Sequence, residues 1–330
     1  VVEMLNQVMT PFDFEMAQLI HEELEQSGIR LILNNGVASF SDKGSGVQIC
    51  LKDGEELYSD LVLLSIGVRP NSDLGKASGL SLNAKGGLVT DEHMKTEDDD
   101  IYAVGDVIEV EDFIDKTRTM IPLAGPANKQ GRIAADNIAG IDSVYHGTQG
   151  TSIVRVFGLT AANTGYNEKY MLRKGFVKGK DYETLIITQN SHAGYYPGAL
   201  PLTLKLIFSK DGSKIYGAQI IGRDGVDKRI DTIATAMRLN ASVFDLKNLE
   251  FAYAPPFSSA KDPVNMAGFV AENIIKDLVE FSEWDVIEKN QDILILDIRE
   301  DAERMAFSLP NTLNIPLGQL RDSLDEIDKD

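Results

Sequence analysis

Gly105 and Asp106 are the first residues whose types and position suggest chemistry. They follow the apolar run Ile101 to Val104, which predicts a buried strand. Open α/β sheets bind ligands at the carboxyl ends of their strands, and a glycine there lets a ligand approach the backbone closely. Asp106 would then offer a carboxylate acceptor to a sugar or ribityl hydroxyl. The alternative is an ordinary aspartate in a strand-ending turn, without a ligand.

The start of a predicted helix over about 126–138 is the second candidate ligand site. Small residues open this helix in the run Leu123 to Arg132, and Gly140 ends it. The N-terminus of a helix carries free N–H groups and a partial positive charge, which favour an anionic group. A flavin, whose ring edge becomes anionic on reduction, would be stabilised there.

The other reactive side chains predict neither a redox cysteine nor a metal centre. Cys50, the single cysteine, alternates with Gln48 on a predicted hairpin strand, where a thiol most often acts as a small inert apolar group. The four histidines do not pair with cysteine or with one another at metal-ligand spacing, so we expect no metal. No Gly-x-Gly-x-x-Gly motif follows a predicted strand.

The elements that must position these residues can be read from periodicity. Helically spaced apolar residues between Pro11 and Gly28 predict a helix over 11–27. The run Leu61 to Ile66 is almost continuously apolar, which is typical of a parallel strand buried on both faces. Shorter strands are predicted at 29–33, 47–51, 56–58 and 101–104.

The pattern changes at Thr151. Turn-separated strands are predicted at 153–157, 184–188, 202–208 and 215–221, with a helix at 227–239. This order is typical of an α+β domain. A further unit is predicted to begin near Phe281, with a strand at 293–296.

Composition limits the possible partners. The chain has 330 residues, of which 43% are hydrophobic and 25% charged, as expected for two or three globular domains. A net charge of −19 disfavours nucleic acid and anionic membranes, and no apolar run is long enough to span a bilayer. A single cysteine excludes a disulfide framework, so we expect a reducing, cytoplasmic location.

Together these segments resemble the pyridine nucleotide–disulfide oxidoreductase family. The Gly105-Asp106 segment and the helix after Leu123 resemble the second half of its FAD domain, and Leu61 to Asn71 resembles the end of its NAD(P)H-binding domain. Two further runs, Phe251 to Asn265 and His192 to Gly198, resemble coenzyme A-disulfide reductases and close NADH oxidases. The fold implied is α/β, a partial flavoprotein with two dinucleotide-binding domains and an α+β dimerisation domain.

The resemblance implies domain boundaries and a fragment. Residues 1–67 would end the NAD(P)H-binding domain, 68–148 the FAD-binding domain, and 149–279 would form the dimerisation domain. Residues 280–330 resemble the start of a rhodanese-like α/β domain, carried by Asp297-Ile298-Arg299, Glu303 and Asn314 to Leu317. The family's His-Ile-Pro-Gly stretch is replaced by Phe307 to Asn311. We expect the glycine motifs and redox cysteine to precede Val1.

The resemblance also implies a reaction. NAD(P)H, either NADH or NADPH, would reduce FAD, and a cysteine outside this chain would reduce a disulfide or persulfide of coenzyme A. Tyr253 and Tyr195 would be catalytic residues donated by the partner subunit of a homodimer, with Tyr196 as the alternative to its neighbour. The cofactor-binding residues would be Gly67, Thr96, Gly105, Asp106, Pro122, Leu123, Ala124 and Tyr253. Asn128, Arg132 and Lys261 would bind coenzyme A.

Two alternative functions remain. One is an NADH oxidase or peroxidase, in which oxygen or peroxide replaces the disulfide. The other, for residues 1–330 alone, is a non-catalytic dimer-forming scaffold. A coenzyme A-binding lysine, two tyrosines and a rhodanese-like tail suited to sulfane sulfur favour the disulfide or persulfide reductase.

Overall fold

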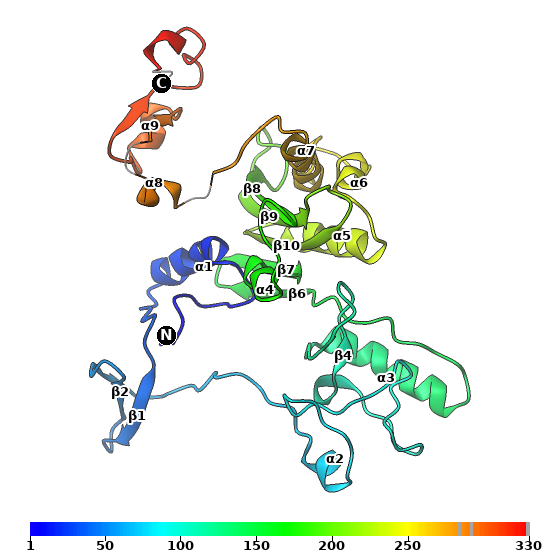
Figure 1. Cartoon of the computed structure of the whole chain (residues 1–330). Helices are drawn as coiled ribbons and strands as arrows, with labels where there is room; N and C mark the ends of the chain where they lie inside the picture. Colours follow the sequence, from blue (N-terminus) through cyan, green and yellow to red (C-terminus); the bar gives the residue numbers. More distant parts are fainter. Residues whose placement is uncertain (283–284, 291–292, 328–330) are drawn as a thin grey trace. The chain divides into compact units, whose positions relative to one another are not determined.

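The structure is a computed structural model that describes residues 1–282, 285–290 and 293–327. Its internal contacts divide the chain into two units, residues 1–279 and 280–330. Both units mix helices with strands (Figure 1). Within the described residues, no helix is both long and apolar enough to cross a membrane.

The first part of the chain holds one helix and one small sheet. Helix α1 (Phe14–Gln26) confirms the predicted helix, but it begins after Pro11 rather than at it, with Asp13 as its N-cap. Strands β1 (Val37–Asp42), β2 (Val47–Leu51) and β3 (Glu56–Ser59) form an antiparallel sheet in that order. The β2–β3 hairpin was predicted, whereas β1 mixes small and polar residues and gives no alternating signal.

The predicted buried strand at 61–66 is wrong. These residues form no strand, and Leu63 and Ile66 are 86% and 89% exposed. A strand needs neighbouring backbone groups to pair with, and no described residue pairs with this run. The strands predicted at 29–33 and 101–104 are likewise reduced to single bridges, Ile32 with Val2 and Tyr102 with Lys95.

The next part surrounds the predicted flavin-binding residues. Helix α2 (Asp73–Ala77), a 3₁₀ turn η1 (Gly105–Val107) and the two-stranded sheet of β4 (Val110–Glu111) and β5 (Arg118–Thr119) precede helix α3 (Ala124–Ile138). A small apolar core that includes Leu88, Ala103, Ile108 and Ala134 holds η1 and α3 together. Helix α3 starts two residues earlier than predicted. The turn at Gly105 packs against it.

The largest sheet within the described residues has five antiparallel strands. Its order is β6-β7-β10-β9-β8, and its strands are β6 (Ser152–Val156), β7 (Leu159–Gly165), β8 (Tyr182–Asn190), β9 (Pro201–Ser209) and β10 (Ile215–Gly222). Its helices are α4 (Glu168–Arg173), α5 (Val226–Arg238), α6 (Val243–Asn248) and α7 (Pro263–Ile275). The main core of the chain lies between this sheet and helices α5 to α7. The sequence predicted every one of these strands except β7.

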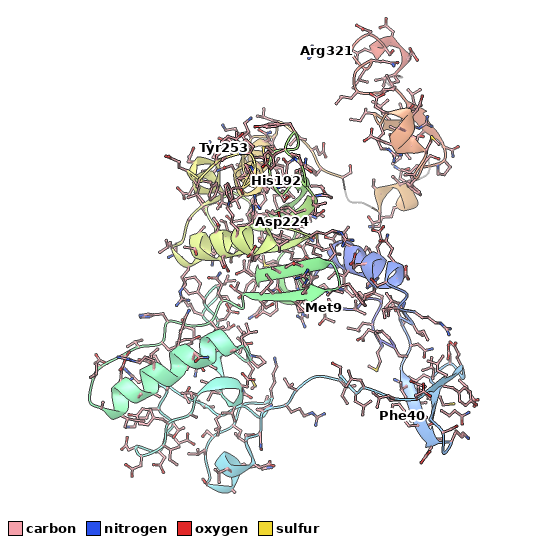
Figure 2. The ribbon with its side chains drawn as sticks, turned by 180° about the vertical axis from the view of Figure 1, so that it is seen from behind. Met9, Phe40, His192, Asp224, Tyr253 and Arg321 are labelled. Atoms are coloured by element: carbon pink, nitrogen blue, oxygen red, sulfur yellow. The ribbon has the colours of Figure 1, made fainter. Side chains whose placement is uncertain are left out.

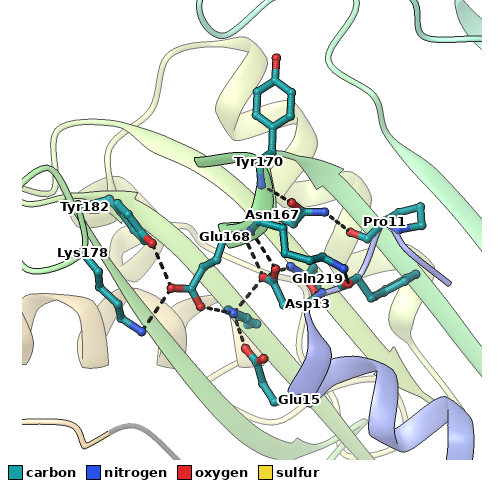
Figure 3. Close-up of polar contacts among 12 residues, drawn as sticks. Pro11, Asp13, Glu15, Asn167, Glu168, Tyr170, Lys178, Tyr182 and Gln219 are labelled. Atoms are coloured by element: carbon teal, nitrogen blue, oxygen red, sulfur yellow. Dashed lines mark hydrogen bonds and ion pairs between the residues drawn. The ribbon is translucent and has the colours of Figure 1, made fainter. Parts of the chain in front are cut away.

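A buried lysine ties α1 to this sheet. Lys205 on β9 is fully buried, and its ammonium pairs with Asp13 at 2.8 Å and also with Glu15 and Glu168, which converge on it (Figure 3). The side chain of Gln219 accepts a hydrogen bond from the Asp13 backbone N–H (2.8 Å) and donates one to its carboxylate (2.6 Å). Apolar residues of α1, including Met16 and Ile20, pack against Ala161 and Ile221 of the sheet.

The second unit is small. It contains α8 (Val286–Lys289), the parallel pair β11 (Ile295–Asp297) and β12 (Thr312–Asn314), α9 (Asp301–Arg304) and a 3₁₀ turn η2 (Leu324–Glu326). Asp297 pairs with Arg299 at 2.8 Å, and Asn314 donates to the carbonyl oxygen of Asp297 at 2.7 Å. Residues 283–284, 291–292 and 328–330 of the predicted rhodanese-like domain lie outside the described residues.

Candidate functional site

Two tyrosine hydroxyls meet at the surface of the five-stranded domain. Tyr195 lies in the loop after β8. Tyr253, which is labelled in Figure 2, lies in the segment between α6 and α7. Their hydroxyl oxygens are 2.8 Å apart, although the residues are 58 positions apart in sequence. Tyr195 is 77% exposed and Tyr253 is 47% exposed, so both phenols are open to an incoming group.

The electrostatics of this pair favour a protonated phenol. The hydrogen bond with Tyr195 raises the pKa of Tyr253 above its ordinary value, and burial adds to the shift. An ordinary tyrosine already titrates near ~10, so Tyr253 keeps its proton at neutral pH. The pair can therefore donate a hydrogen bond or a proton to an anion held against it.

Tyr196, the alternative to Tyr195, faces a different neighbour. Its ring packs edge-on against His192, with 5.9 Å between ring centroids. His192 is buried, and its ring nitrogens lie 3.1 Å from the Ser191 hydroxyl and 3.3 Å from the Pro197 carbonyl oxygen. The structure thus brings Tyr195 rather than Tyr196 to Tyr253.

Backbone contacts hold the two tyrosine segments together. The N–H of Ser191 donates to the Leu200 carbonyl at 2.8 Å, which closes the loop that carries Tyr195. The N–H of Ala193 donates to the carbonyl oxygens of Ser258 (3.1 Å) and Pro255 (3.3 Å) in the segment that carries Tyr253. The geometry of the tyrosine pair is therefore set by the domain and not by the two side chains alone.

A separate cavity gathers part of the predicted flavin site. Its volume is about 650 Å³, and it is lined by Val68, Arg69, Pro70, Asn71, Lys85, Val104, Asp106, Val107, Met120 and Pro122. Asp106 is exposed and Pro122 directly precedes Leu123, the N-cap of α3. The sequence did not single out Lys85 and Met120, which carry no motif, whereas Arg69 lies in the run that resembles the family.

The backbone of this cavity suits a large anionic cofactor. Gly105 has a left-handed φ of 82°, and its N–H donates to the side chain of Gln130 on α3 at 2.8 Å. The first N–H groups of α3, from Ala124 onwards, have no partner within the helix. The exposed Asp106 carboxylate and the cations Arg69 and Lys85 line this cavity, and Pro122 of its lining lies two residues before the start of α3. This arrangement fits the ribityl chain and ring edge of a flavin.

Six of the predicted cofactor residues lie outside the cavity lining: Gly67, Thr96, Gly105, Leu123, Ala124 and Tyr253. Thr96 is buried, and its hydroxyl donates to the carbonyl oxygen of Ile101 at 3.0 Å, so it holds the turn that precedes Gly105. Gly67 is exposed, with a left-handed φ of 94°, and directly precedes Val68 of the lining. The turn at Gly67 therefore directs the chain towards the cavity.

The three predicted substrate-binding residues lie on two elements. On α3, exposed Asn128 donates to the Ala124 carbonyl at 2.9 Å, and exposed Arg132 pairs with Asp136 at 2.8 Å. Lys261 is exposed beside α7, with its ammonium 5.7 Å from the centre of the Phe269 ring. Within the described residues, no hydrogen bond or ion pair joins Lys261 to the two residues of α3.

The remaining reactive side chains of the described residues are one cysteine and one acidic group. Cys50 lies on β2 and is half-buried. Among the described residues, one acidic group, Asp13, Glu15 and Glu168, brings its oxygens within 4.8 Å of one another. The ammonium of Lys205 pairs with all three carboxylates, so this group is an ion-pair cluster with its own cation.

Comparison with known proteins places the chain in one family by two separate matches. Residues 1–131 match the profile described as pyridine nucleotide-disulphide oxidoreductase. Residues 151–263 match the profile of the dimerisation domain of the same family.

Two curated relatives illustrate the similarity. A coenzyme A disulfide reductase of Staphylococcus epidermidis is 35% identical over 261 residues, which are 79% of this chain and 57% of that protein. An NADH oxidase of Methanocaldococcus jannaschii is 34% identical over 281 residues, which are 84% of this chain and 60% of that protein. The chain therefore spans less than two thirds of either relative.

Solved structures agree with these matches. The structure described as reduced Bacillus anthracis CoADR-RHD superimposes with a TM-score of 0.93 at 48% identity, covering 100% of this chain and 58% of that one. An NAD-dependent persulfide reductase from A. fulgidus superimposes with a TM-score of 0.93 at 36% identity, covering 100% of this chain and 60% of that one.

Proposed function

Because the chain belongs to the pyridine nucleotide-disulphide oxidoreductase family, we propose that the protein reduces a disulfide or persulfide of coenzyme A with NAD(P)H. FAD is the cofactor in this proposal, and NADH or NADPH is the co-substrate. The observation that carries the proposal is the pair of exposed tyrosine hydroxyls, 2.8 Å apart, on the dimerisation domain.

The tyrosine pair would act on the sulfur that leaves the substrate. Reduction of a disulfide by NAD(P)H and one proton yields two thiols, so at least one departing sulfur must gain a proton. A departing thiolate, whose conjugate thiol has a pKa near ~8.5, accepts a hydrogen bond, and a phenol that keeps its proton at pH 7 can donate one and pass on its proton as negative charge develops on the sulfur. We assign this donor role to Tyr253, with Tyr195 holding its hydroxyl in place.

The cavity beside Asp106 would hold FAD. The Asp106 carboxylate would accept from a ribityl hydroxyl, and the N-terminus of α3 from Ala124 would face the ring edge. Gly105, without a side chain, allows close approach of the cofactor to the backbone. When bound, FAD supplies two-electron transfer from a nicotinamide to a disulfide.

The redox cysteine of this reaction would be a residue other than Cys50. Cys50 lies on a hairpin strand, and none of the tyrosine or cavity residues is near it in sequence. We also propose a homodimer in which each subunit supplies Tyr195 and Tyr253 to the site of its partner. Sedimentation should therefore give a two-fold dimer, and a fully active monomer would contradict the exchange of tyrosines between subunits.

Coenzyme A is the substrate class that the exposed cations suit. Lys261 would pair with a phosphate as a point charge, and Asn128 and Arg132 on α3 would contact the remainder of the molecule. We retain the boundaries 1–67, 68–148, 149–279 and 280–330 for the four parts of the chain. The last part is proposed to be rhodanese-like, which suits a persulfide as substrate.

An NADH oxidase is the second candidate, because one relative carries that name. The two are separated by measuring NADH and NADPH consumption by the complete enzyme with coenzyme A disulfide, coenzyme A persulfide and oxygen as acceptors. We expect a coenzyme A acceptor to give the highest kcat/KM. If NAD(P)H is consumed with oxygen alone, and adding either coenzyme A acceptor does not increase the rate, the proposal is contradicted and the oxidase is favoured.

A further inference from the structure

Arg229 is a fully buried cation that touches both tyrosine segments. It lies on α5, is 1% exposed, and pairs with Asp262, which is also 1% exposed. Its Nε and Nη2 donate to one carboxylate oxygen of Asp262 at 3.1 Å and 2.9 Å. Its Nη2 also donates to the carbonyl oxygen of Ser191 at 2.7 Å.

These bonds reach both segments. Ser191 begins the loop that carries Tyr195, and Asp262 ends the segment that carries Tyr253. The hydroxyl of buried Ser258, which belongs to the second segment, donates to the same Asp262 oxygen at 2.7 Å. Asp262 also caps α7 by accepting from the N–H of Val264 at 3.0 Å. One guanidinium therefore links α5, the Tyr195 loop and the start of α7.

The space around Arg229 is built for the guanidinium. Its Nη1 donates to the carbonyl oxygen of Gly225 at 3.0 Å, and Gly225 has a left-handed φ of 70°. A Cβ at position 225 would lie 2.0 Å from that nitrogen. Burial raises the pKa of Asp262, but the hydrogen bonds and charge of Arg229, with the hydrogen bonds from Val264 and Ser258, outweigh burial. The pKa is therefore below its ordinary value, and the carboxyl stays ionised at neutral pH.

A buried ion pair of this kind is poorly explained by stability. Removing two charges from water has a large cost, and well-packed apolar residues usually stabilise a core at least as well. What an apolar pair cannot supply is a planar fork that fixes three oxygen atoms at once. The three acceptors here, Gly225, Ser191 and Asp262, come from separate segments of the chain.

We infer that Arg229 is a positioning residue for the tyrosine pair, fixing the distance between the hydroxyls of Tyr195 and Tyr253. The inference rests on the proposed function, because it gives that distance a role in reducing the substrate. Displacing a reacting group by about 1 Å typically costs up to ~10²-fold in rate. The loss should therefore appear in the rate of the disulfide step, with little change in substrate affinity.

The test uses the complete holoenzyme with Arg229→Lys. This change keeps the positive charge but removes the planar guanidinium that donates to several acceptors at once. In stopped-flow experiments we expect the disulfide step to slow by ~10- to 100-fold, with KM within about threefold and reduction of the flavin by NAD(P)H within about twofold. The Arg229→Lys/Tyr253→Phe double variant should be no slower than Tyr253→Phe alone. Multiplicative losses in the double variant, or a disulfide step at the wild-type rate, would overturn the inference.

Two further variants separate positioning from folding. Arg223→Lys changes another arginine of the same domain, which pairs with Glu23 at 2.5 Å, and should leave both steps unchanged. Asp262→Asn keeps an oxygen to cap α7 and removes the charge that Arg229 requires. It should slow the disulfide step as Arg229→Lys does, and it serves as the test if Arg229→Lys does not fold.

A crystal structure of the Arg229→Lys holoenzyme gives a readout that does not depend on activity. We expect the two hydroxyl oxygens to move beyond hydrogen-bonding distance, and an unchanged 2.8 Å contact would overturn the inference. If Tyr253→Phe alone leaves the disulfide step unchanged, the proposed role of the tyrosines fails. The crystal structure would then still decide whether Arg229 positions them.

Discussion

Replacing Lys205 by methionine should strongly destabilise the protein, because it leaves buried carboxylates without their cation. The side chains of Lys205 and Asp13 are 1% and 2% exposed, and their ion pair joins α1 to the five-stranded sheet at 2.8 Å. Glu15 and Glu168 pair with the same ammonium (Figure 3). Methionine has a similar length but no charge, so the change isolates the electrostatic contribution.

The magnitude follows from the burial of the pair. Breaking a buried ion pair by removing one partner typically costs ~3–5 kcal/mol of unfolding free energy. For a folding unit of this size, such a loss lowers the melting temperature by roughly 6–20 °C. Lys205→Met/Asp13→Asn should recover part of the loss, because it also removes one of the uncompensated charges.

The pH dependence has a definite sign. Burial raises the pKa of Asp13, but the charge of Lys205 and several hydrogen bonds outweigh it, so the folded-state pKa is lowered. In the wild type this group therefore contributes stability above pH ~4 that is lost as the pH falls through the folded-state pKa. In Lys205→Met, burial alone should raise the folded-state pKa of Asp13, so stability is instead lost as the pH rises. The difference between the two proteins should shrink as the pH is lowered from 7 towards 4.5.

The assay is thermal or urea unfolding at several pH values. Lys210→Met is the matched control, because Lys210 pairs with Glu183 at 2.5 Å and its side chain is 48% exposed. That change should cost no more than ~1 kcal/mol. Equal losses for the two lysines at pH 7, or a difference that grows on acidification, would refute the reasoning.

The other predictions concern substrate, backbone and cofactor. Lys261→Ala should lower kcat/KM for coenzyme A disulfide by ~10- to 150-fold, mostly through KM, since a charge-assisted hydrogen bond contributes ~1.5–3 kcal/mol; equal losses with a small phosphate-free disulfide would indicate a structural lysine. Gly225→Ala should lower the melting temperature more than Gly44→Ala, because both glycines have positive φ (70° and 77°) but only position 225 meets another atom within 4 Å; equal shifts would contradict the close fit around Arg229. Gln130→Ala should weaken FAD binding by roughly fivefold, because the Gly105 N–H loses an acceptor worth ~1 kcal/mol. Flavin fluorescence on release measures this affinity, and an unchanged value would contradict the assignment of this cavity to FAD.

The sequence predicts elements well where local signals are complete. Helix α1, the β2–β3 hairpin and α5 combine clear periodicity with glycine turns, and each forms within a few residues of its predicted bounds. Strand β7 was missed because Ala161, Ala162 and Asn163 give no alternating apolar pattern, although the first two are fully buried. The strand predicted at 61–66 is wrong for the opposite reason: the apolar pattern is present, but a strand cannot form without a neighbouring strand to pair with.

The candidate site could be predicted only in part. The residue types of Tyr195 and Tyr253 were recognisable, but their contact joins segments 58 positions apart and depends on tertiary packing. Arg229 gave no signal, because an arginine on an amphipathic helix normally belongs to its solvated face. Its burial becomes visible only when the β8 loop and the start of α7 are folded onto α5.

The central claim, that the tyrosine pair protonates the departing sulfur, is tested most directly by stopped-flow kinetics of Tyr253→Phe in the complete enzyme, with Tyr196→Phe as the control. We predict that flavin reduction by NAD(P)H is nearly unchanged and that the disulfide step slows by roughly 10²-fold, the lower end for loss of a positioned proton donor. Tyr196→Phe should leave both steps near wild type, because its ring packs against His192 rather than Tyr253. A slowed flavin step with an intact disulfide step in Tyr253→Phe would contradict the account.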